Sequence, residues 1–466
     1  MPIEQKRKRA EVLKSHCPEL EISTESAVLE SHGCDWTRFR KPDAAAVAFP
    51  RSIEDVTRLV EVAAEHGIPL VPSGGRTGLS GGAVADAGEV VVSFDRMRRI
   101  IDFNAVDRTL TVEPGVVTQA IQDYAAQRDL YYPVSFASEG SSQVGGNIAT
   151  NAGGIRVLRY GLTRDQVAGL KVVDGQGVLL ECNGGLVKNA SGYDLRHLFI
   201  GSEGTLGLIV EATLRLTDPP LPSRVMLLAV SDLDAMTRVF RQFNDALNLT
   251  AFEFLSDRAM SHVRAGHGLP APMETTTPYY ALLEFDCADT GAEDLALQHF
   301  ETWLDEGFVA DGVISQSEAQ AADLWRYREG ISEAITKYTP YKNDLSVRIS
   351  QIPSYLDDLD RLVRTRYPGF EVLWYGHFGD GNLHMNILKP ADMTVEEFEH
   401  ACGQVNPEVF ELTRAHMGSI SAEHGIGLLK QAWLPYTRSD ADIERMRAIK
   451  RVFDPKNILN PGKLLG

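Results

Sequence analysis

The stretch "AVAFPRSIEDVTRLVEVAAEHGIPLVPSGG" constrains the fold of this chain more than any other. A short apolar run comes first, Ser52 can cap the helix that follows, and apolar residues then recur at helical spacing. The apolar face of this helix would carry Val56, Leu59, Val60 and Ala63. A second apolar run leads into a glycine-rich loop. This order predicts a β-α-β unit that ends in a loop of unusual backbone freedom.

That loop, "PSGGRTGLSGG", carries five glycines in eleven residues. Glycine accepts positive φ angles, and successive amides in such a loop can turn inward as an anion-binding nest. A pyrophosphate is the natural guest, whereas a flexible surface turn is the alternative for the loop taken alone. The spelling excludes two familiar nucleotide sites, because a P-loop needs Gly-Lys-Ser/Thr and the Rossmann fingerprint needs G-x-G-x-x-G.

Two further glycine-rich stretches follow along the chain. In "SSQVGGNIATNAGGIRVLRYG" the small and amide residues would let a flat ring approach the backbone closely. In "GLVKNASGYDLRHLFIGSEGTLGLIVEATLRL" three glycines precede a predicted strand, and Ser202 could bind a cofactor or cap the turn. Neither stretch identifies a ligand by itself.

Composition excludes several functional classes. A net charge of -18 argues against a nucleic-acid partner, which would need clustered Lys and Arg. The five cysteines are scattered without a C-x-x-C pair, so we expect neither a disulfide framework nor a cysteine zinc site. No apolar run is long enough to cross a bilayer, and the first residues lack a secretory signal. The predicted compartment is therefore the cytoplasm.

Alternating helical and strand patterns over 466 residues predict an α+β fold of more than one domain. The segment "DPPLPSR", Asp218 to Arg224, has three prolines and marks a linker. We expect an N-terminal helical segment at residues 1–41 and a first domain at 42–217. A second domain at 218–420 and a C-terminal segment at 421–466 complete the prediction.

A pair of histidines in "HFGDGNLHMN" suggests a metal site. If "GDGN" is a hairpin loop, His377 lies opposite His384 and both rings can reach one ion. Stacking or burial is the alternative for an isolated pair. Further on, "ISAEHGIGLLK" offers Glu423 as a third ligand, which would leave coordination positions open for a substrate. The adjacent His424 is then free for proton transfer, whereas a helix-starting acid beside an exposed histidine is the other interpretation.

The motifs "PSGGRTGLSGG", "GGNIATNAGG", "KNASGYDL" and "GSEGTLG", in this order, resemble the FAD-binding domain of the vanillyl-alcohol oxidase and p-cresol methylhydroxylase superfamily. This resemblance implies a two-subdomain FAD-binding domain, an α+β cap domain with an antiparallel sheet, and a C-terminal helical segment that packs near the flavin. Some relatives attach the flavin to a histidine of the first loop. This loop carries Arg76 instead, so the resemblance implies non-covalent FAD.

By the same resemblance, a set of loop and helix residues would bind the cofactor. These residues are Pro72, Ser73, Gly74, Gly75, Arg76, Thr77, Gly78, Ser80, Pro114, Gly115, Ser138, Gly140, Gly145, Gly146, Asn147, Thr150, Asn151, Gly153, Gly154, Gly204, Ile209 and Asn460.

The histidine segment and "AEHGIG" resemble the D-2-hydroxyacid dehydrogenase branch of this superfamily. In that branch His377, His384 and Glu423 would ligate a divalent metal, with zinc the expected ion. Asn386 would contact the substrate and His424 would act as general base. The implied reaction is hydride transfer from C2 of a D-2-hydroxy acid to flavin N5, which yields the 2-oxo acid.

A last segment, "LWRYREGISEAITKYTPYKNDLS", resembles D-2-hydroxyglutarate dehydrogenases, where Arg328, Ser332 and Lys342 would bind the substrate's carboxylate. Arg328 and Ser332 would share one helix face, and display to solvent is the other interpretation of their charge. Asn343 departs from the aromatic residue expected there. D-2-hydroxyglutarate, oxidised to 2-oxoglutarate, is the expected substrate, with D-lactate as main rival and D-malate as a second activity.

The sequence leaves two rival functional classes open. A flavin-free metal-dependent hydrolase would use the same three ligands to activate water, and a non-catalytic subunit of an oxidase complex would bind FAD without turnover. For the dehydrogenase we expect an acceptor other than NAD or oxygen, such as an electron-transfer flavoprotein or a quinone. A homodimer is left open.

Overall fold

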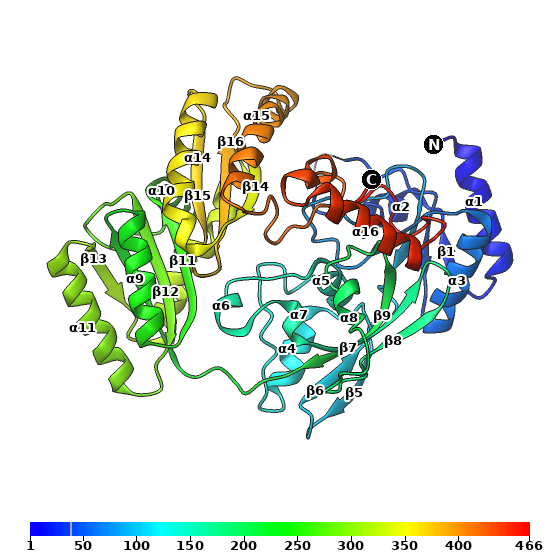
Figure 1. Cartoon of the computed structure of the whole chain (residues 1–466), viewed down its shortest axis with the longest axis horizontal. Coiled ribbons are helices and arrows are strands. Elements are labelled where there is room, and N and C mark those ends of the chain that lie inside the picture. The colour runs from blue at the N-terminus through cyan, green and yellow to red at the C-terminus, as the bar shows by residue number, and fades with distance from the viewer. Residues whose placement is uncertain (38–39) are drawn as a thin grey trace. The chain divides into compact units, whose positions relative to one another are not determined.

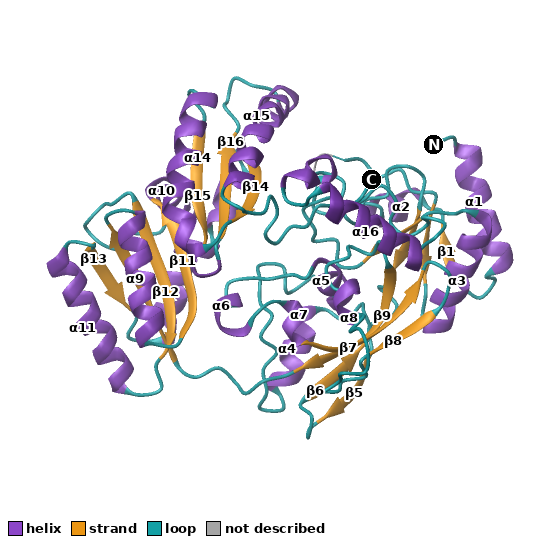
Figure 2. Ribbon diagram, in the orientation of Figure 1, coloured by secondary structure: helices purple, strands orange, loops and turns teal. Residues whose placement is uncertain are grey.

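The computed structural model describes residues 1–37 and 40–466 and divides into two compact units. The first unit comprises residues 1–154, 161–219 and 423–466, and the second comprises residues 155–160 and 220–422. Figure 1 shows the course of the chain by colour, and Figure 2 separates helices from strands. Within the described residues, no helix combines the length and the apolar character that a membrane crossing requires.

The first unit contains a four-stranded sheet in the order β1-β2-β4-β3. Strands β2 (Ala46–Phe49), β4 (Val90–Ser93) and β3 (Leu70–Ser73) are parallel, whereas β1 (Glu21–Ser23) is antiparallel to β2. Helix α3 (Ile53–His66) connects β2 to β3, and its first turn is capped by Ser52 Oγ, which accepts from the Asp55 N–H at 3.1 Å. The predicted β-α-β unit is confirmed. Strand β1 is not foreseen by the prediction of a helical segment at residues 1–41.

A second sheet of the first unit has five strands in the order β5-β6-β9-β7-β8, and each paired neighbour is antiparallel. Its strands are β5 (Ile100–Asn104), β6 (Thr109–Val112), β7 (Val167–Asp174), β8 (Leu179–Cys182) and β9 (Gly207–Arg215). The remaining helices of this unit are α1 (Ile3–His16), α2 (Ser26–His32), α4 (Thr118–Ala126), α5 (Val144–Thr150), α7 (Thr163–Gln166), α8 (Arg196–Phe199), the 3₁₀ helix η3 (Gln431–Tyr436) and α16 (Asp440–Phe453).

The end of the chain belongs to the first unit. Leu459 forms an isolated parallel bridge with Leu70 beside β3, and it lies in the same buried cluster as the apolar faces of α1 and α3. The next residue, Asn460, donates from Nδ2 to the carbonyls of Gly82 and Glu203 at 2.9 and 2.7 Å. The C-terminal tail therefore fixes two loops that are more than a hundred residues apart in sequence.

The second unit is built on one antiparallel sheet in the order β13-β10-β12-β11-β15-β16-β14. The strands are β10 (Ser223–Val230), β11 (Leu249–Ser256), β12 (Tyr279–Asp286), β13 (Val309–Ile314), β14 (Tyr341–Ser346), β15 (Glu371–His377) and β16 (Asn382–Leu388). The helices are α6 (Val157–Tyr160), α9 (Leu233–Ala246), α10 (Asp257–His267), α11 (Thr290–Glu306), α12 (Glu318–Glu329), α13 (Ile331–Thr336), α14 (Ile352–Arg366), α15 (Val395–Ala415), and the 3₁₀ helices η1 (Ile349–Gln351) and η2 (Phe378–Asp380).

The two faces of this sheet differ in character. One face packs aromatic residues against α9 and α11, with Phe243 close to Phe285 and to Trp303. The other face packs against α10, α12 and α13 through a cluster that includes Leu282, Ile331 and Tyr375, but it also carries buried polar side chains. Because side chains alternate along a strand, the polar residues of neighbouring strands meet on that second face.

Candidate active site

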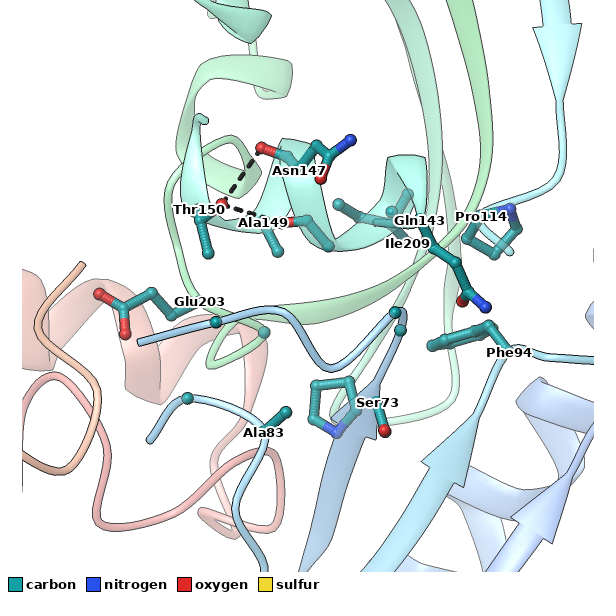
Figure 3. Close-up of a pocket in the computed structure, with 18 of the residues that line it drawn as sticks. Ser73, Ala83, Phe94, Pro114, Gln143, Asn147, Ala149, Thr150, Glu203 and Ile209 are labelled. Atoms are coloured by element: carbon teal, nitrogen blue, oxygen red, sulfur yellow. Dashed lines mark hydrogen bonds between the residues drawn. The ribbon is translucent and has the colours of Figure 1, made fainter. Parts of the chain in front are cut away.

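A pocket in the first unit collects the three glycine-rich stretches of the sequence. Its cavity volume is about 140 Å³, and it lies between the loop after β3, helix α5 and the start of β9 (Figure 3). Fifteen of the residues expected to bind FAD line it: Pro72, Ser73, Gly74, Gly75, Arg76, Thr77, Gly78, Ser80, Pro114, Gly145, Gly146, Asn147, Thr150, Gly204 and Ile209. Each of the three glycine-rich stretches, which are distant in sequence, thus contributes one wall of the pocket.

The first loop suits an anion because its backbone donors are not used by the protein. Within residues 1–37 and 40–466, the N–H groups from Gly74 to Ser80 donate no hydrogen bond to another protein group. Most of these residues are partly exposed, and a run of unused backbone donors along one pocket forms a concave site that suits an anion. The pyrophosphate of FAD fits this donor set.

Glycine is required here at different positions for different reasons. A Cβ on Gly75 would lie 2.2 Å from the carbonyl oxygen of Ser141, so the loop could not pack against its neighbour. A Cβ on Gly146, in helix α5, would meet no atom within 4 Å, because that position faces open space in the pocket wall. The first glycine shapes the loop, and the second leaves room for a bound group.

The side chain of Arg76 is turned toward the protein. Its Nη1 donates to the Gly74 carbonyl at 2.9 Å and to Asp95 Oδ2 at 3.3 Å. Asp95 also pairs with His32 Nε2 at 3.1 Å and accepts from Gln143 Nε2 at 2.7 Å. Burial alone would raise the pKa of Asp95, but the hydrogen bonds from His32 and Gln143 and the charge of Arg76 outweigh it and hold that pKa well below its usual range. Arg76 therefore braces the loop through an ionised carboxylate.

Seven of the expected FAD residues do not line this pocket: Gly115, Ser138, Gly140, Asn151, Gly153, Gly154 and Asn460. Several of them support the pocket from behind. A Cβ on Gly115 would lie 2.1 Å from the Phe94 carbonyl oxygen, and one on Gly154 would lie 2.0 Å from that of Ser135. These glycines permit close backbone packing, and Asn460 holds the carbonyls of Gly82 and Glu203.

Sequence reasoning missed nine lining residues: Asp35, Gly82, Ala83, Phe94, Gln143, Ala149, Glu203, Gly207 and Leu208. Glu203 is the most informative of them. It adopts a positive φ of 53°, and its carboxylate accepts from the N–H groups of Ile426 and Gly427 at 2.8 and 2.7 Å. Burial raises the pKa of Glu203 against the effect of these two hydrogen bonds. The glutamate of "GSEGTLG" thus ties the pocket to the segment that begins at Glu423.

The second group of interest is the set of predicted metal ligands. One ligand atom from each of His377, His384 and Glu423 lies within 4.8 Å of the others. The rings of His377 and His384 are 5.3 Å apart and nearly perpendicular. Two imidazole nitrogens and a carboxylate oxygen form a donor set that suits zinc and related divalent ions, so the residues present fit such an ion.

The predicted register of the histidine hairpin is wrong. His377 lies opposite Asn382, and His384 lies opposite Tyr375. The turn has four residues, as expected, but it is shifted by one residue toward the N-terminus: Phe378–Asp380 form the 3₁₀ helix η2, and Gly381 takes a φ of 85° before β16 begins. The two histidines still project from one face of the sheet, since Asn382 and His384 are two residues apart.

Each histidine has a buried carboxylate behind it that sequence reasoning missed. Glu253 on β11 accepts from His377 Nδ1 at 2.7 Å, and Asp344 on β14 lies 3.7 Å from His384 Nδ1. Asp344 also accepts from the backbone N–H of Ala422, the residue before Glu423, at 3.0 Å. At hydrogen-bonding distance, Glu253 fixes the tautomer of His377 and leaves its Nε2 for an ion, whereas Asp344 lies beyond that distance from His384.

The residues expected to hold the substrate lie on the same face of this sheet or on the helices above it. Arg328 lies in the last turn of α12 and Ser332 in the first turn of α13, two successive helices that meet at Gly330. The prediction that both share one helix face is therefore wrong. Both contact Tyr375: the Arg328 guanidinium lies 5.0 Å from its ring centre, and Ser332 Oγ is 2.9 Å from its hydroxyl. Lys342 lies opposite the buried Asn386 in the β14–β16 ladder.

Comparison with known proteins finds two matching domain families and close relatives. The model of the FAD binding domain matches residues 44–183, and that of the C-terminal domain of FAD linked oxidases matches residues 220–464. A D-2-hydroxyglutarate dehydrogenase of Xanthomonas citri pv. viticola is 56% identical over 97% of this chain and 96% of its own. Another, from Stutzerimonas stutzeri, is 54% identical over 95% of this chain and 96% of its own.

This chain belongs to the D-2-hydroxyglutarate dehydrogenase group of the FAD-linked oxidases. The crystal structure of p-cresol methylhydroxylase with substrate bound matches it with a TM-score of 0.77 at 15% identity, over 99% of this chain and 97% of that one. That match shows the fold, an FAD-binding domain with a cap domain on an antiparallel sheet, and the predicted fold class is confirmed.

As an FAD-linked oxidase, the chain carries its cofactor domain in the first unit, where the glycine pocket lies. One of the two carboxylates behind the histidines gives a sequence signal. Glu253 interrupts the apolar run "AFEFLS", whereas Asp344 stands in the mostly polar segment "YKNDLS" and gives none. An acidic residue at a core-facing strand position needs a partner, and histidines were available.

Proposed function

We propose that this protein oxidises D-2-hydroxyglutarate to 2-oxoglutarate. Two observations together support this: a His377, His384 and Glu423 group suited to a metal, in a chain more than half identical to two D-2-hydroxyglutarate dehydrogenases. Arg328 and Lys342 supply positive charge for a second carboxylate, which D-lactate lacks.

The residues of the chain divide the work as follows. When bound, FAD supplies a hydride acceptor and a divalent ion, with zinc proposed, supplies a Lewis acid toward the substrate's hydroxyl and C1 carboxylate. The ion would be held by His377, His384 and Glu423, and Asn386 would orient the substrate beside it. His424 would remove the proton from the C2 hydroxyl, since an imidazole is well matched to that task near neutral pH.

FAD would be held without a covalent bond by the loop amides from Gly74 to Ser80 and by helix α5, with Gly115, Ser138, Gly140, Asn151, Gly153, Gly154 and Asn460 shaping the same region. The proposed FAD-binding domain is 42–217 and the proposed cap domain is 218–420, with an N-terminal segment at 1–41 and a C-terminal segment at 421–466. A cytoplasmic location and an acceptor such as an electron-transfer flavoprotein or a quinone also belong to it.

The decisive experiment is anaerobic mixing of the purified protein with D- and L-2-hydroxy acids while flavin absorbance is followed. We expect D-2-hydroxyglutarate to bleach the flavin fastest, D-malate and D-lactate more slowly, and the L-enantiomers not at all. Chelation should abolish bleaching, and Zn²⁺ should restore it. Faster bleaching by D-lactate would refute the substrate assignment, full activity after verified metal removal would refute the metal, and a colourless protein after FAD reconstitution would favour the metal-dependent hydrolase.

A further inference from the structure

The buried face of the cap sheet carries two glutamates that differ in their surroundings. Glu253 on β11 and Glu284 on β12 project to the same face, because Glu284 lies opposite Ala251 and Ala251 is two residues from Glu253. Their exposed fractions are 1% and 5%. A buried carboxylate is costly without compensating partners, so the identity of the partners shows what each carboxylate is for.

The partners of Glu284 are structural. It accepts from Thr250 Oγ1 at 2.6 Å and from Trp325 Nε1 at 3.0 Å, and it lies 3.4 Å from Arg156 Nε. None of these three residues is among those proposed to hold metal, substrate or flavin. Glu284 therefore joins strands and helices of the second unit without reaching the site.

The partners of Glu253 both belong to the proposed site. Its Oε1 is 2.7 Å from His377 Nδ1, and its Oε2 is 2.7 Å from Arg328 Nε. The second contact is an ion pair and not a well-aligned hydrogen bond, since neither Oε2 nor Arg328 Nε makes a hydrogen bond. A single carboxylate thus spans a metal-type ligand and an arginine.

The geometry fixes which atoms of each partner remain available. With Nδ1 directed to Glu253, the Nε2 of His377 is the nitrogen that can bind an ion. With Arg328 Nε paired with Glu253 at 2.7 Å and the guanidinium 5.0 Å from the Tyr375 ring, the two terminal nitrogens are the ones that can meet a ligand carboxylate. Arg328 is 7% exposed, so these contacts hold it in one orientation.

We propose that Glu253 is a positioning residue that couples metal binding to recognition of the substrate's distal carboxylate, by holding His377 with one oxygen and Arg328 with the other. This rests on the proposed function, in which His377 is a metal ligand and Arg328 binds a dicarboxylate. A change at Glu253 must then alter metal affinity and dicarboxylate preference together, although Glu253 itself touches neither ligand.

Glu253→Gln is the sharpest test because the amide has the same size but a single acceptor oxygen, so it cannot serve both partners. We expect the purified, FAD-loaded variant to bind Zn²⁺ about tenfold more weakly or worse, measured by competition with a chromophoric chelator. Its KM for D-2-hydroxyglutarate should rise more than its kcat falls, and its preference over D-lactate should drop about tenfold. FAD content should stay unchanged.

Glu284→Gln is the matched control and should change neither Zn²⁺ affinity nor substrate preference. Glu253→Asp keeps both acceptor oxygens on a shorter side chain and should recover part of the Zn²⁺ affinity and part of the substrate preference. If Glu253→Gln does not fold, these two quantities are measured on Glu253→Asp instead. Unchanged Zn²⁺ affinity in folded Glu253→Gln, or weaker Zn²⁺ binding with an unchanged preference, would overturn the coupling. If the unaltered protein neither binds Zn²⁺ nor acts on D-2-hydroxyglutarate, the proposed function fails instead.

Discussion

At the scale of single residues, Gly146 shows how a small side chain serves a ligand at a cost to the helix. It lies inside α5, where glycine is about 1 kcal/mol less favourable than alanine. Gly146→Ala should therefore stabilise the FAD-free protein by up to about 1 kcal/mol while it weakens FAD binding, because the new methyl group projects into the pocket. Thermal unfolding without FAD and fluorescence titration with FAD measure the two effects.

Gly403→Ala is the control for this prediction. Gly403 lies in helix α15 of the second unit, and a Cβ there would also meet nothing within 4 Å. This variant should gain a similar stability with no change in FAD affinity. Equal FAD affinity in both variants would show that the face of α5 at Gly146 does not contact the cofactor.

Functional residues could be predicted from sequence where they belong to a recognisable motif, and not where a residue lies outside any motif. The glycines of the first loop and the pair of histidines have neighbours that make a pattern. Glu253 and Asp35 do not: the first is a lone acid in an apolar strand, and the second lies outside the predicted FAD domain yet lines the pocket. Their partners come from distant strands and loops, which local spacing cannot reveal.

At the scale of elements, strand and helix positions were predictable but register was not. The capped helix α3 and the strands β2 and β3 on either side of it follow from periodicity, whereas β1 does not. The β15–β16 hairpin was placed in the wrong register because a 3₁₀ turn at Phe378–Asp380 replaces the tight turn. Likewise, the strand order of the cap sheet depends on non-local pairing among several similar apolar runs.

The segment after Glu423 is another element whose geometry depends on a distant residue. Glu203→Gln should leave one of the Ile426 and Gly427 amides without an acceptor, because the glutamine side chain has one oxygen where the carboxylate has two. We expect faster hydrogen exchange at these two amides and weaker FAD binding by several-fold, since Glu203 also lines the pocket. Exchange mass spectrometry and flavin titration provide the measurements.

Glu113→Gln is the comparison for this element. Glu113 is equally buried in the first unit, but its carboxylate serves Arg99 and lies outside the pocket lining. That variant should leave both the exchange of the 426–427 amides and FAD affinity unchanged. Normal exchange at these amides in Glu203→Gln would mean that the segment is held by other contacts.

At the scale of the whole molecule, the first unit is assembled from three separate parts of the sequence, and the sequence alone predicted a C-terminal segment near the flavin without saying what fixes it. In the structure Leu459 pairs with Leu70, and the Asn460 side chain donates to two loop carbonyls. Lys463, three residues further on, is buried. Such long-range closure is invisible to periodicity because each contact joins residues hundreds of positions apart.

Lys463 gives this closure a pH signature. Its Nζ has no hydrogen-bond partner among the described residues, and burial lowers its pKa from 10.5 to about 8 against the attraction of Glu89, Asp86 and Asp35. The folded chain releases this proton near pH 8 and the unfolded chain near pH 10.5, so the free energy of unfolding should rise with pH between these two values. Below pH 8 the buried ammonium should lower the free energy of unfolding by about 3 kcal/mol. Lys463→Met should remove that rise and be more stable at pH 7, as measured by denaturant unfolding from pH 6 to 10.

Lys450→Met is the control. It leaves the carbonyls of Thr205 and Leu459 without their donor, so it should be less stable at every pH. A loss of stability in Lys463→Met at pH 7 would mean that the attraction of the three carboxylates exceeds the cost of burial.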